Sequence, residues 1–97
     1  MAGGGLARRE MTAPVVMYCT AACPFCRSAE RLLLEKGAQI DKIRVDLEPT
    51  RRSEMMQRSG RRTVPQIWIG GRHVGGCDDL YALEAEGKLD PLLEAST

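Results

Sequence analysis

Hydrophobic residues in this 97-residue chain follow two different periods, and the switches between them predict the secondary structure. Residues 15–19 are an apolar run without alternation, which is typical of a strand buried on both faces. The next segment has apolar residues at helical spacing and predicts an amphipathic helix that ends at Gly37. The residues of that apolar face are Phe25, Ala29, Leu32 and Leu33. Residues 40–46 carry β-branched side chains and predict a second strand, which completes a βαβ unit with parallel strands.

The second half of the chain predicts two more strands and further helices. Gly70-Gly71 is a hairpin signal between two short segments, so the third and fourth strands are expected to pair antiparallel. The expected elements are a helix over 49–58, strands over 66–69 and 72–74, a helix over 78–86 and a last helical turn from residue 90. This order, βαβ-α-ββ-α, predicts an α/β fold in which helices flank one four-stranded mixed sheet.

Composition and charge limit which domain organisation and which partners are expected for the protein. Residues 1–13 include three consecutive glycines and show no periodicity, which predicts a disordered N-terminal extension before one domain over 14–97. The chain has no apolar run of the ~20 residues that span a bilayer, and its start lacks the apolar core of a secretory signal. A cytoplasmic protein is therefore expected. The formal net charge of +1 indicates neither nucleic acid nor a membrane as partner, and a monomer is the expected state.

Four cysteines carry the candidate chemistry: Cys19, Cys23, Cys26 and Cys77. In a chain without a secretory signal, cysteines are more often catalytic or metal-binding than paired in structural disulfides. Cys23 and Cys26 are separated by two residues where the first strand gives way to the first helix, so they can close as a disulfide or open as a dithiol. The N–H groups of the helix stabilise the thiolate of Cys23, which is the attacking species in thiol–disulfide exchange.

Three segments of the chain together resemble those of the dithiol glutaredoxins, which have a thioredoxin-like fold. They are Cys23-Pro24-Phe25-Cys26, Thr63-Val64-Pro65 and Gly75-Gly76-Cys77-Asp78-Asp79. The resemblance extends over nearly all of the expected domain. It implies a glutathione-dependent oxidoreductase that reduces glutathionylated proteins and protein disulfides. Cys23 would then be the nucleophile and Cys26 the resolving thiol, with glutathione as co-substrate and no metal.

The resemblance also implies a glutathione site outside the two cysteines. A cis bond before Pro65 would offer the Val64 backbone to the ligand as a short strand edge, although a proline in this place is equally compatible with a trans bond. The N–H groups that begin the last long helix would receive a ligand carboxylate, and Asp78 or Asp79 would accept from the ligand ammonium. The implied contacts are Phe25, Arg52, Thr63, Val64, Pro65, Gly76, Cys77, Asp78 and Asp79.

Two positions depart from the usual pattern of the family. Phe25 replaces the commoner tyrosine, so the ring can wall the site but brings no hydroxyl. Thr20 stands where many relatives have a lysine three residues before the nucleophile, which removes a positive charge near the sulfur. The resemblance therefore implies either weaker glutathione binding or a substitute cation, for which Arg27, Arg52 and Arg62 are the candidates.

Other chemistries are open to these cysteines. Cys19, Cys23 and Cys26 match the spacing of a [4Fe–4S] site in radical-generating enzymes, but those enzymes need a much larger barrel. His73 beside the cysteines suggests zinc, although a structural zinc site usually uses two close cysteine pairs and only one exists here, so a solvated strand position explains His73 better. Two alternative functions remain: a thioredoxin-like reductant served by a flavoprotein reductase, and a glutathione-ligated [2Fe–2S] module, which the rigid Pro24 disfavours.

Overall fold

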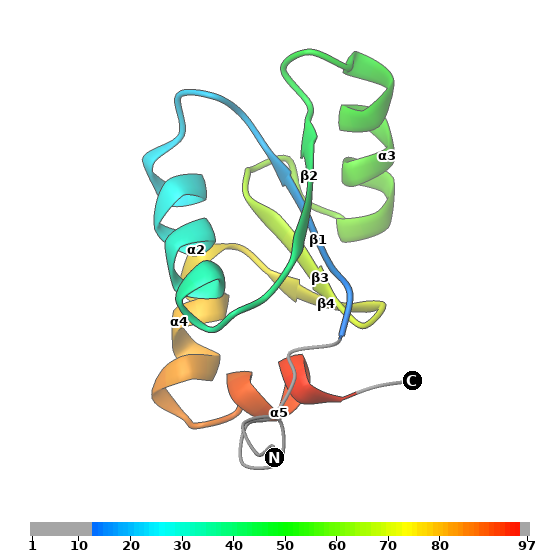
Figure 1. Cartoon of the computed structure of the whole chain (residues 1–97). Helices are drawn as coiled ribbons and strands as arrows, with labels where there is room; N and C mark the ends of the chain where they lie inside the picture. The colour runs from blue at the N-terminus through cyan, green and yellow to red at the C-terminus, as the bar shows by residue number, and fades with distance from the viewer. Residues whose placement is uncertain (1–12, 96–97) are drawn as a thin grey trace.

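The computed structural model describes residues 13–95, and its sheet carries helices on both faces (Figure 1). The elements in chain order are β1 (Val15–Cys19), α2 (Pro24–Glu35), β2 (Ile40–Arg44), α3 (Pro49–Ser59), β3 (Gln66–Ile69), β4 (Arg72–Gly75), α4 (Cys77–Ala85) and α5 (Leu89–Glu94). The strand order is β2-β1-β3-β4. β1 runs parallel to β2 and antiparallel to β3, and β4 is antiparallel to β3. The predicted thioredoxin-like α/β fold with a four-stranded mixed sheet is confirmed.

Alternate residues of β1 belong to two different hydrophobic cores. Met17 lies in the core that α2, α4 and α5 build, together with the fully buried Leu33. Tyr18, the next residue, faces the opposite side and packs with Met55 of α3 and Trp68 of β3. Accordingly, α2 and α4 cover one face of the sheet and α3 covers the other (Figure 1). A strand with a core on each face needs apolar side chains at successive positions, which explains the unbroken apolar run.

One residue of the expected apolar face of α2 is placed wrongly by the sequence pattern. Phe25 is 60% exposed, whereas Cys26, one residue further on, is buried. Cys26 precedes Ala29 and Leu33 by three and seven residues, so it lies nearer the middle of the buried stripe than Phe25 does. The aromatic ring is therefore free to form part of a surface site instead of the core.

The second strand and the last helix also differ from their expected limits. β2 ends at Arg44, two residues early, because the N–H groups of Leu47 and Glu48 both donate to the Arg44 carbonyl and close a turn. The Arg44 guanidinium holds the carboxylate of Asp46 in the same turn, with both N···O distances at 2.7 Å. The turn expected from residue 90 is part of the six-residue helix α5.

The start of the described chain is joined to the fold. Ala13 is buried, and its N–H donates to the carbonyl of Leu93 in α5 at 3.0 Å. This residue thus belongs to the edge of the domain and not to the expected extension, whose other residues, 1–12, lie outside the described part. None of the helices found between residues 13 and 95 is long and apolar enough to cross a bilayer.

Candidate active site

Cys23 is held at the start of α2 by the backbone of the helix that it caps. Its backbone is extended (φ −103°, ψ 110°), and its Sγ accepts a hydrogen bond from the Cys26 N–H at 3.2 Å. Pro24 occupies the first helical position, where its fixed φ suits the helix and its missing N–H costs nothing. The sulfur therefore accepts from one of the free N–H groups of the helix N-terminus.

Cys26 is the buried member of the pair. Burial, followed by the hydrogen bond with Cys23, raises the pKa of the Cys26 thiol to about 12. Its side chain packs in the core between β1 and α2, whereas Cys23 is partly exposed. At neutral pH Cys26 is consequently a protonated thiol, which is not the nucleophilic form of cysteine.

This difference predicts which thiol alkylates. In a Cys23→Ser variant at pH 7, iodoacetamide should leave Cys26 unmodified on the time scale on which it fully modifies Cys23 of the wild type, because burial keeps the Cys26 thiol protonated. Peptide mapping by mass spectrometry of the quenched reactions measures the modification of Cys26 in the variant and of Cys23 in the wild type. Cys26 modification as fast as that of Cys23 would contradict the assignment.

The turn before β3 reaches the sulfur of Cys23. The Val64–Pro65 peptide bond is cis, as the resemblance implied. The Cys23 thiol lies 3.7 Å from the Val64 carbonyl oxygen and donates to it. Within residues 13–95 nothing accepts from the Val64 N–H. A short backbone edge with a free N–H and a carbonyl thus lies directly beside the reactive thiol, which is the arrangement that binds an extended peptide.

A cavity of about 280 Å³ opens beside this edge. It is lined by Phe25, Arg61, Thr63, Val64, Pro65, Gly76, Cys77, Asp78 and Asp79. The structure thus brings all the implied glutathione contacts together except Arg52. That arginine is exposed on α3 and donates to the backbone carbonyl of Arg62 at 3.3 Å. The cation that lines the cavity is Arg61, which was not among the three arginines expected to substitute for the lysine.

Asp79 and Asp78 have different roles at the start of α4. The Asp79 carboxylate accepts from the Gly76 N–H at 2.9 Å and from the Arg61 guanidinium at 2.8 Å, and these two bonds hold its pKa below the usual value, with Arg61 as the larger cause. Asp78 is exposed, and no partner for its carboxylate occurs in the described part of the chain. Of the two acids, Asp78 is therefore the one that is free to accept from a ligand.

The glycine pair before α4 is required at its first member. Gly75 has a φ of +118°, and a Cβ on it would overlap the carboxylate of Asp79. Gly76 is less constrained, because a Cβ there would lie 3.4 Å from the Pro65 carbonyl oxygen. Gly75 thus leaves room for the Asp79 carboxylate to bond the backbone at the start of α4. The sequence had indicated a role for Gly76 and not for Gly75.

Cys77, the first residue of α4, lines the cavity without being a second nucleophile. Burial raises the pKa of its thiol, and the nearby Asp78 and Cys23 act in the same direction. All four cysteines are free thiols in the structure. Cys77 therefore stays protonated near neutrality and presents a small, weakly polar wall to the cavity.

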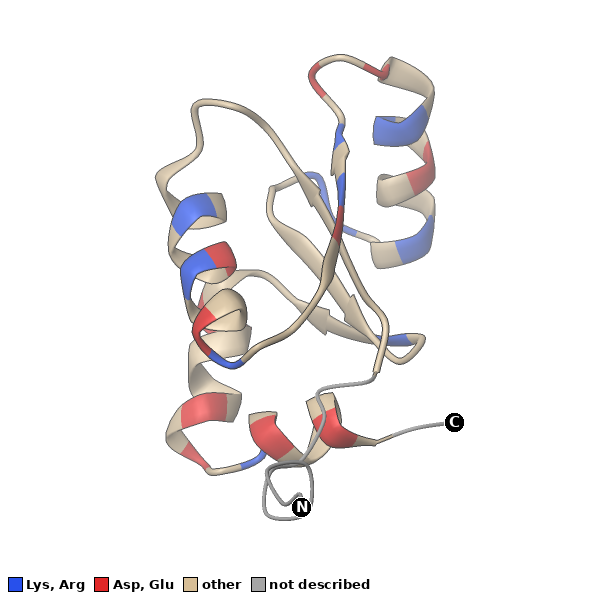
Figure 2. Cartoon of the chain, in the orientation of Figure 1, with Lys and Arg blue, Asp and Glu red and all other residues tan. Residues whose placement is uncertain are grey.

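Basic and acidic residues lie in separate parts of the chain that meet at the cavity. Residues 49–62 include five arginines and one glutamate, whereas residues 77–95 include six acids and one lysine. Figure 2 shows blue ribbon segments on α3 and red ribbon segments on α4 and α5, toward opposite sides of the molecule. The cavity lies where the two regions meet, at Arg61 and Asp79. A ligand with both a carboxylate and an ammonium finds an opposite charge for each end.

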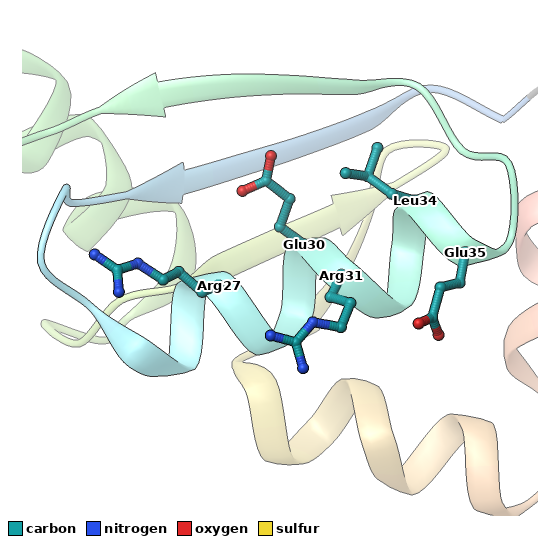
Figure 3. A pocket seen from close by; sticks show the side chains of 5 residues that line it. All are labelled: Arg27, Glu30, Arg31, Leu34 and Glu35. Carbon is teal, nitrogen blue, oxygen red and sulfur yellow. The ribbon is translucent and has the colours of Figure 1, made fainter.

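Two other hollows are separate from this site. The larger, about 410 Å³, lies along the outer face of α2, and all its lining side chains come from that one helix (Figure 3). It contains no thiol and no converging polar groups, so its size does not make it the reactive centre. The other, about 230 Å³, lies behind the dithiol between Cys19 and Lys42. Cys19 itself is buried, and burial raises the pKa of its thiol, which fits a core side chain.

A thioredoxin-like fold with a dithiol at the first turn of α2 defines a thiol–disulfide oxidoreductase. Comparison with known proteins narrows the class: a family model for glutaredoxin matches residues 15–74. The glutaredoxin of Pseudomonas aeruginosa is 56% identical over 82 residues, 84% of this chain and 98% of the relative. Glutaredoxin 3 of Escherichia coli is 51% identical over 82 residues, 84% and 99% of the two chains. The chain belongs to the glutaredoxin family.

Solved structures agree with this assignment. The solution structure of glutaredoxin from Brucella melitensis superposes with a TM-score of 0.75 at 56% identity, covering 84% of this chain and 88% of that one. The crystal structure of a buckwheat glutaredoxin–glutathione complex gives a TM-score of 0.78 at 34% identity and covers 84% and 77%.

Proposed function

We propose that this protein reduces glutathione mixed disulfides and protein disulfides with glutathione as the electron source. One observation carries the proposal: the partly exposed Cys23 sulfur lies beside a free backbone edge that borders a cavity with charges of both signs. Charges of both signs suit glutathione, which carries carboxylates and an ammonium.

Each part of the cavity fits one part of glutathione. The Val64 N–H and carbonyl suit the cysteinyl backbone of the tripeptide, which places its sulfur next to Cys23. The start of α4 suits the γ-glutamyl group, because its N–H groups favour a carboxylate and Asp78 is free to accept from the ammonium. Arg61 suits the glycine carboxylate in place of the lysine that Thr20 replaces. Phe25 contributes an apolar wall.

The proposed reaction consists of two thiol–disulfide exchanges. The Cys23 thiolate attacks the glutathione sulfur of a mixed disulfide, so that the new S–S bond joins Cys23 to glutathione and the substrate leaves as a thiolate. A second glutathione thiolate then attacks the glutathione sulfur bound to Cys23. It releases oxidised glutathione and restores the Cys23 thiolate. The cycle consumes one free glutathione: the substrate sulfur leaves as a thiol, and the glutathione of the mixed disulfide ends in oxidised glutathione together with the free one.

Cys26 offers a second exit from the same intermediate. Its sulfur attacks Cys23 Sγ and forms the Cys23–Cys26 disulfide, while the bound partner is expelled and leaves as a thiol that carries the proton given up by Cys26. Two glutathione molecules later reduce that disulfide. We assign this route to protein disulfides, for which the first mixed disulfide joins Cys23 to a protein. The whole site is contributed by one chain, so a monomer suffices, and the reaction suits the reducing cytoplasm.

A steady-state assay with a glutathione mixed disulfide, glutathione and glutathione reductase tests the proposal. The expected result is turnover that saturates with the mixed disulfide and depends on glutathione. Turnover only with a thioredoxin-type flavoprotein reductase would favour the thioredoxin-like alternative. Visible absorption of anaerobically purified protein, with no glutathione turnover, would favour a [2Fe–2S] module instead.

A further inference from the structure

A buried amide links the Thr63–Pro65 turn to β4, the strand at one edge of the sheet. Gln66 is the first residue of β3 and has no exposed surface. Its Nε2 donates to the Thr63 carbonyl at 3.0 Å and to the Thr63 hydroxyl at 3.3 Å. Its Oε1 lies 2.8 Å from Nε2 of His73 in β4. All the polar atoms of this buried amide are therefore used, and they link the cavity turn to a histidine outside the cavity.

The bonds of Gln66 determine the protonation of the histidine ring. A carbonyl oxygen only accepts, so the amide nitrogen of Gln66 must face Thr63 and its oxygen must face His73. Nε2 of His73 therefore carries the hydrogen. The ring also packs against Trp68, with ring centroids 4.6 Å apart, so the hydrogen bond to Gln66 and the contact with Trp68 both hold it. His73 is thus a packed donor and not the solvated strand residue that the sequence predicted.

The same bonds affect what Thr63 offers to a ligand. Its hydroxyl oxygen accepts from Gln66, so its own hydrogen is left to donate into the cavity that Thr63 lines. Its carbonyl is fixed by the same amide, one residue before the Val64 edge. Loss of the Gln66 amide would leave both groups of Thr63 unheld next to the substrate.

We propose that Gln66 and His73 are a positioning pair that holds Thr63, and with it the Val64 backbone edge, in the geometry that binds glutathione beside Cys23. Neither side chain touches the substrate or the reacting sulfur. His73 acts through Gln66 by fixing the direction of its amide, and Gln66 acts on the turn. The inference rests on the proposed glutathione reaction, because it assigns these residues to substrate affinity within it.

The test measures kcat and KM of the full chain for a glutathione mixed disulfide in three variants. Gln66→Met keeps the length and packing of the side chain without the amide, and should raise KM about five- to tenfold with kcat nearly unchanged, the effect of one or two lost neutral hydrogen bonds. His73→Phe keeps a ring against Trp68 without the donor, and should raise KM by a smaller factor. The double variant should match Gln66→Met alone, since His73 acts only through the amide.

Controls separate this result from general damage and from failure of the proposed function. Arg72→Gln changes an exposed neighbour of His73 on β4 and should leave KM unchanged. An unchanged KM in folded Gln66→Met, or independent multiplicative effects in the double variant, would overturn the pair. Nitrogen-15 NMR of the wild-type imidazole supplies a readout without turnover: hydrogen on Nε2 is expected, and hydrogen on Nδ1 would overturn the inference even if the variants do not fold. Wild-type protein without saturable turnover would instead refute the proposed function.

Discussion

Replacing Cys23 with serine should reduce the exchange of glutathione mixed disulfides to the uncatalysed background. Serine preserves the shape and can still accept from the Cys26 N–H, but its hydroxyl does not ionise near neutrality and forms no disulfide. No other thiol is placed to take over, because burial keeps both Cys26 and Cys77 protonated. The steady-state glutathione assay measures this loss directly.

The matched control for this variant removes a thiol outside the cavity. Cys19→Ala deletes a buried sulfur from β1, and we expect some loss of stability but activity close to that of the wild type. Thermal unfolding followed by circular dichroism shows that both variants are folded. Substantial activity in folded Cys23→Ser would mean that another cysteine is the nucleophile, and equal inactivation by Cys19→Ala would mean that the assay reports loss of structure.

The fold could be predicted from the sequence because its local signals agree with one another. The doubly buried β1 has an unbroken apolar run, and Gly60 ends α3 with a φ of +73°, where a left-handed residue is needed. The failures come from the limits of one-dimensional patterns. Helical spacing placed Phe25 in the core because it matched Ala29 at i+4, although Cys26 fits the middle of the stripe better.

The site was predictable only as far as its residues lie in short motifs. Thr63, Val64 and Pro65 could be placed beside Cys23 because they form one recognisable segment. Arg61 could not, because its position depends on an ion pair with Asp79, 18 residues further along the chain. Long-range pairs of this kind are set by how strands and helices pack, which no spacing within the sequence records.

The unequal burial of Cys23 and Cys26 suits the two separate uses that we propose for the dithiol. Cys23 is partly exposed beside the Val64 edge, where we propose that it meets substrates, whereas Cys26 lies in the core and would meet only what is already bonded to Cys23. A small glutathione adduct on Cys23 leaves its sulfur open to a second glutathione. In the proposed route, a protein attached to Cys23 would cover the cavity and leave the Cys26 thiol beneath it as the attacking group within reach.

Cys26→Ser should therefore separate the two activities. We expect turnover on small glutathione mixed disulfides to stay within a few-fold of the wild type, because neither of its two steps uses Cys26. Reduction of a protein disulfide should fall to background, because the mixed disulfide between Cys23 and the protein is no longer resolved. The unresolved mixed disulfide is itself a second readout. It should accumulate as a covalent complex that non-reducing gel electrophoresis detects and that added thiol reduces.

The substitution is mild for the fold, which makes the comparison informative. Serine is close in size to cysteine, but it places a hydroxyl in a site that is 4% exposed, so we expect some loss of stability while the Cys26 N–H still reaches Cys23 Sγ. Both substrates are measured on the same preparation, so any loss of folded protein lowers the two rates by the same factor. Only their ratio reports on Cys26: a ratio equal to that of the wild type would refute the division of roles, because it would show that glutathione resolves protein adducts as readily as its own.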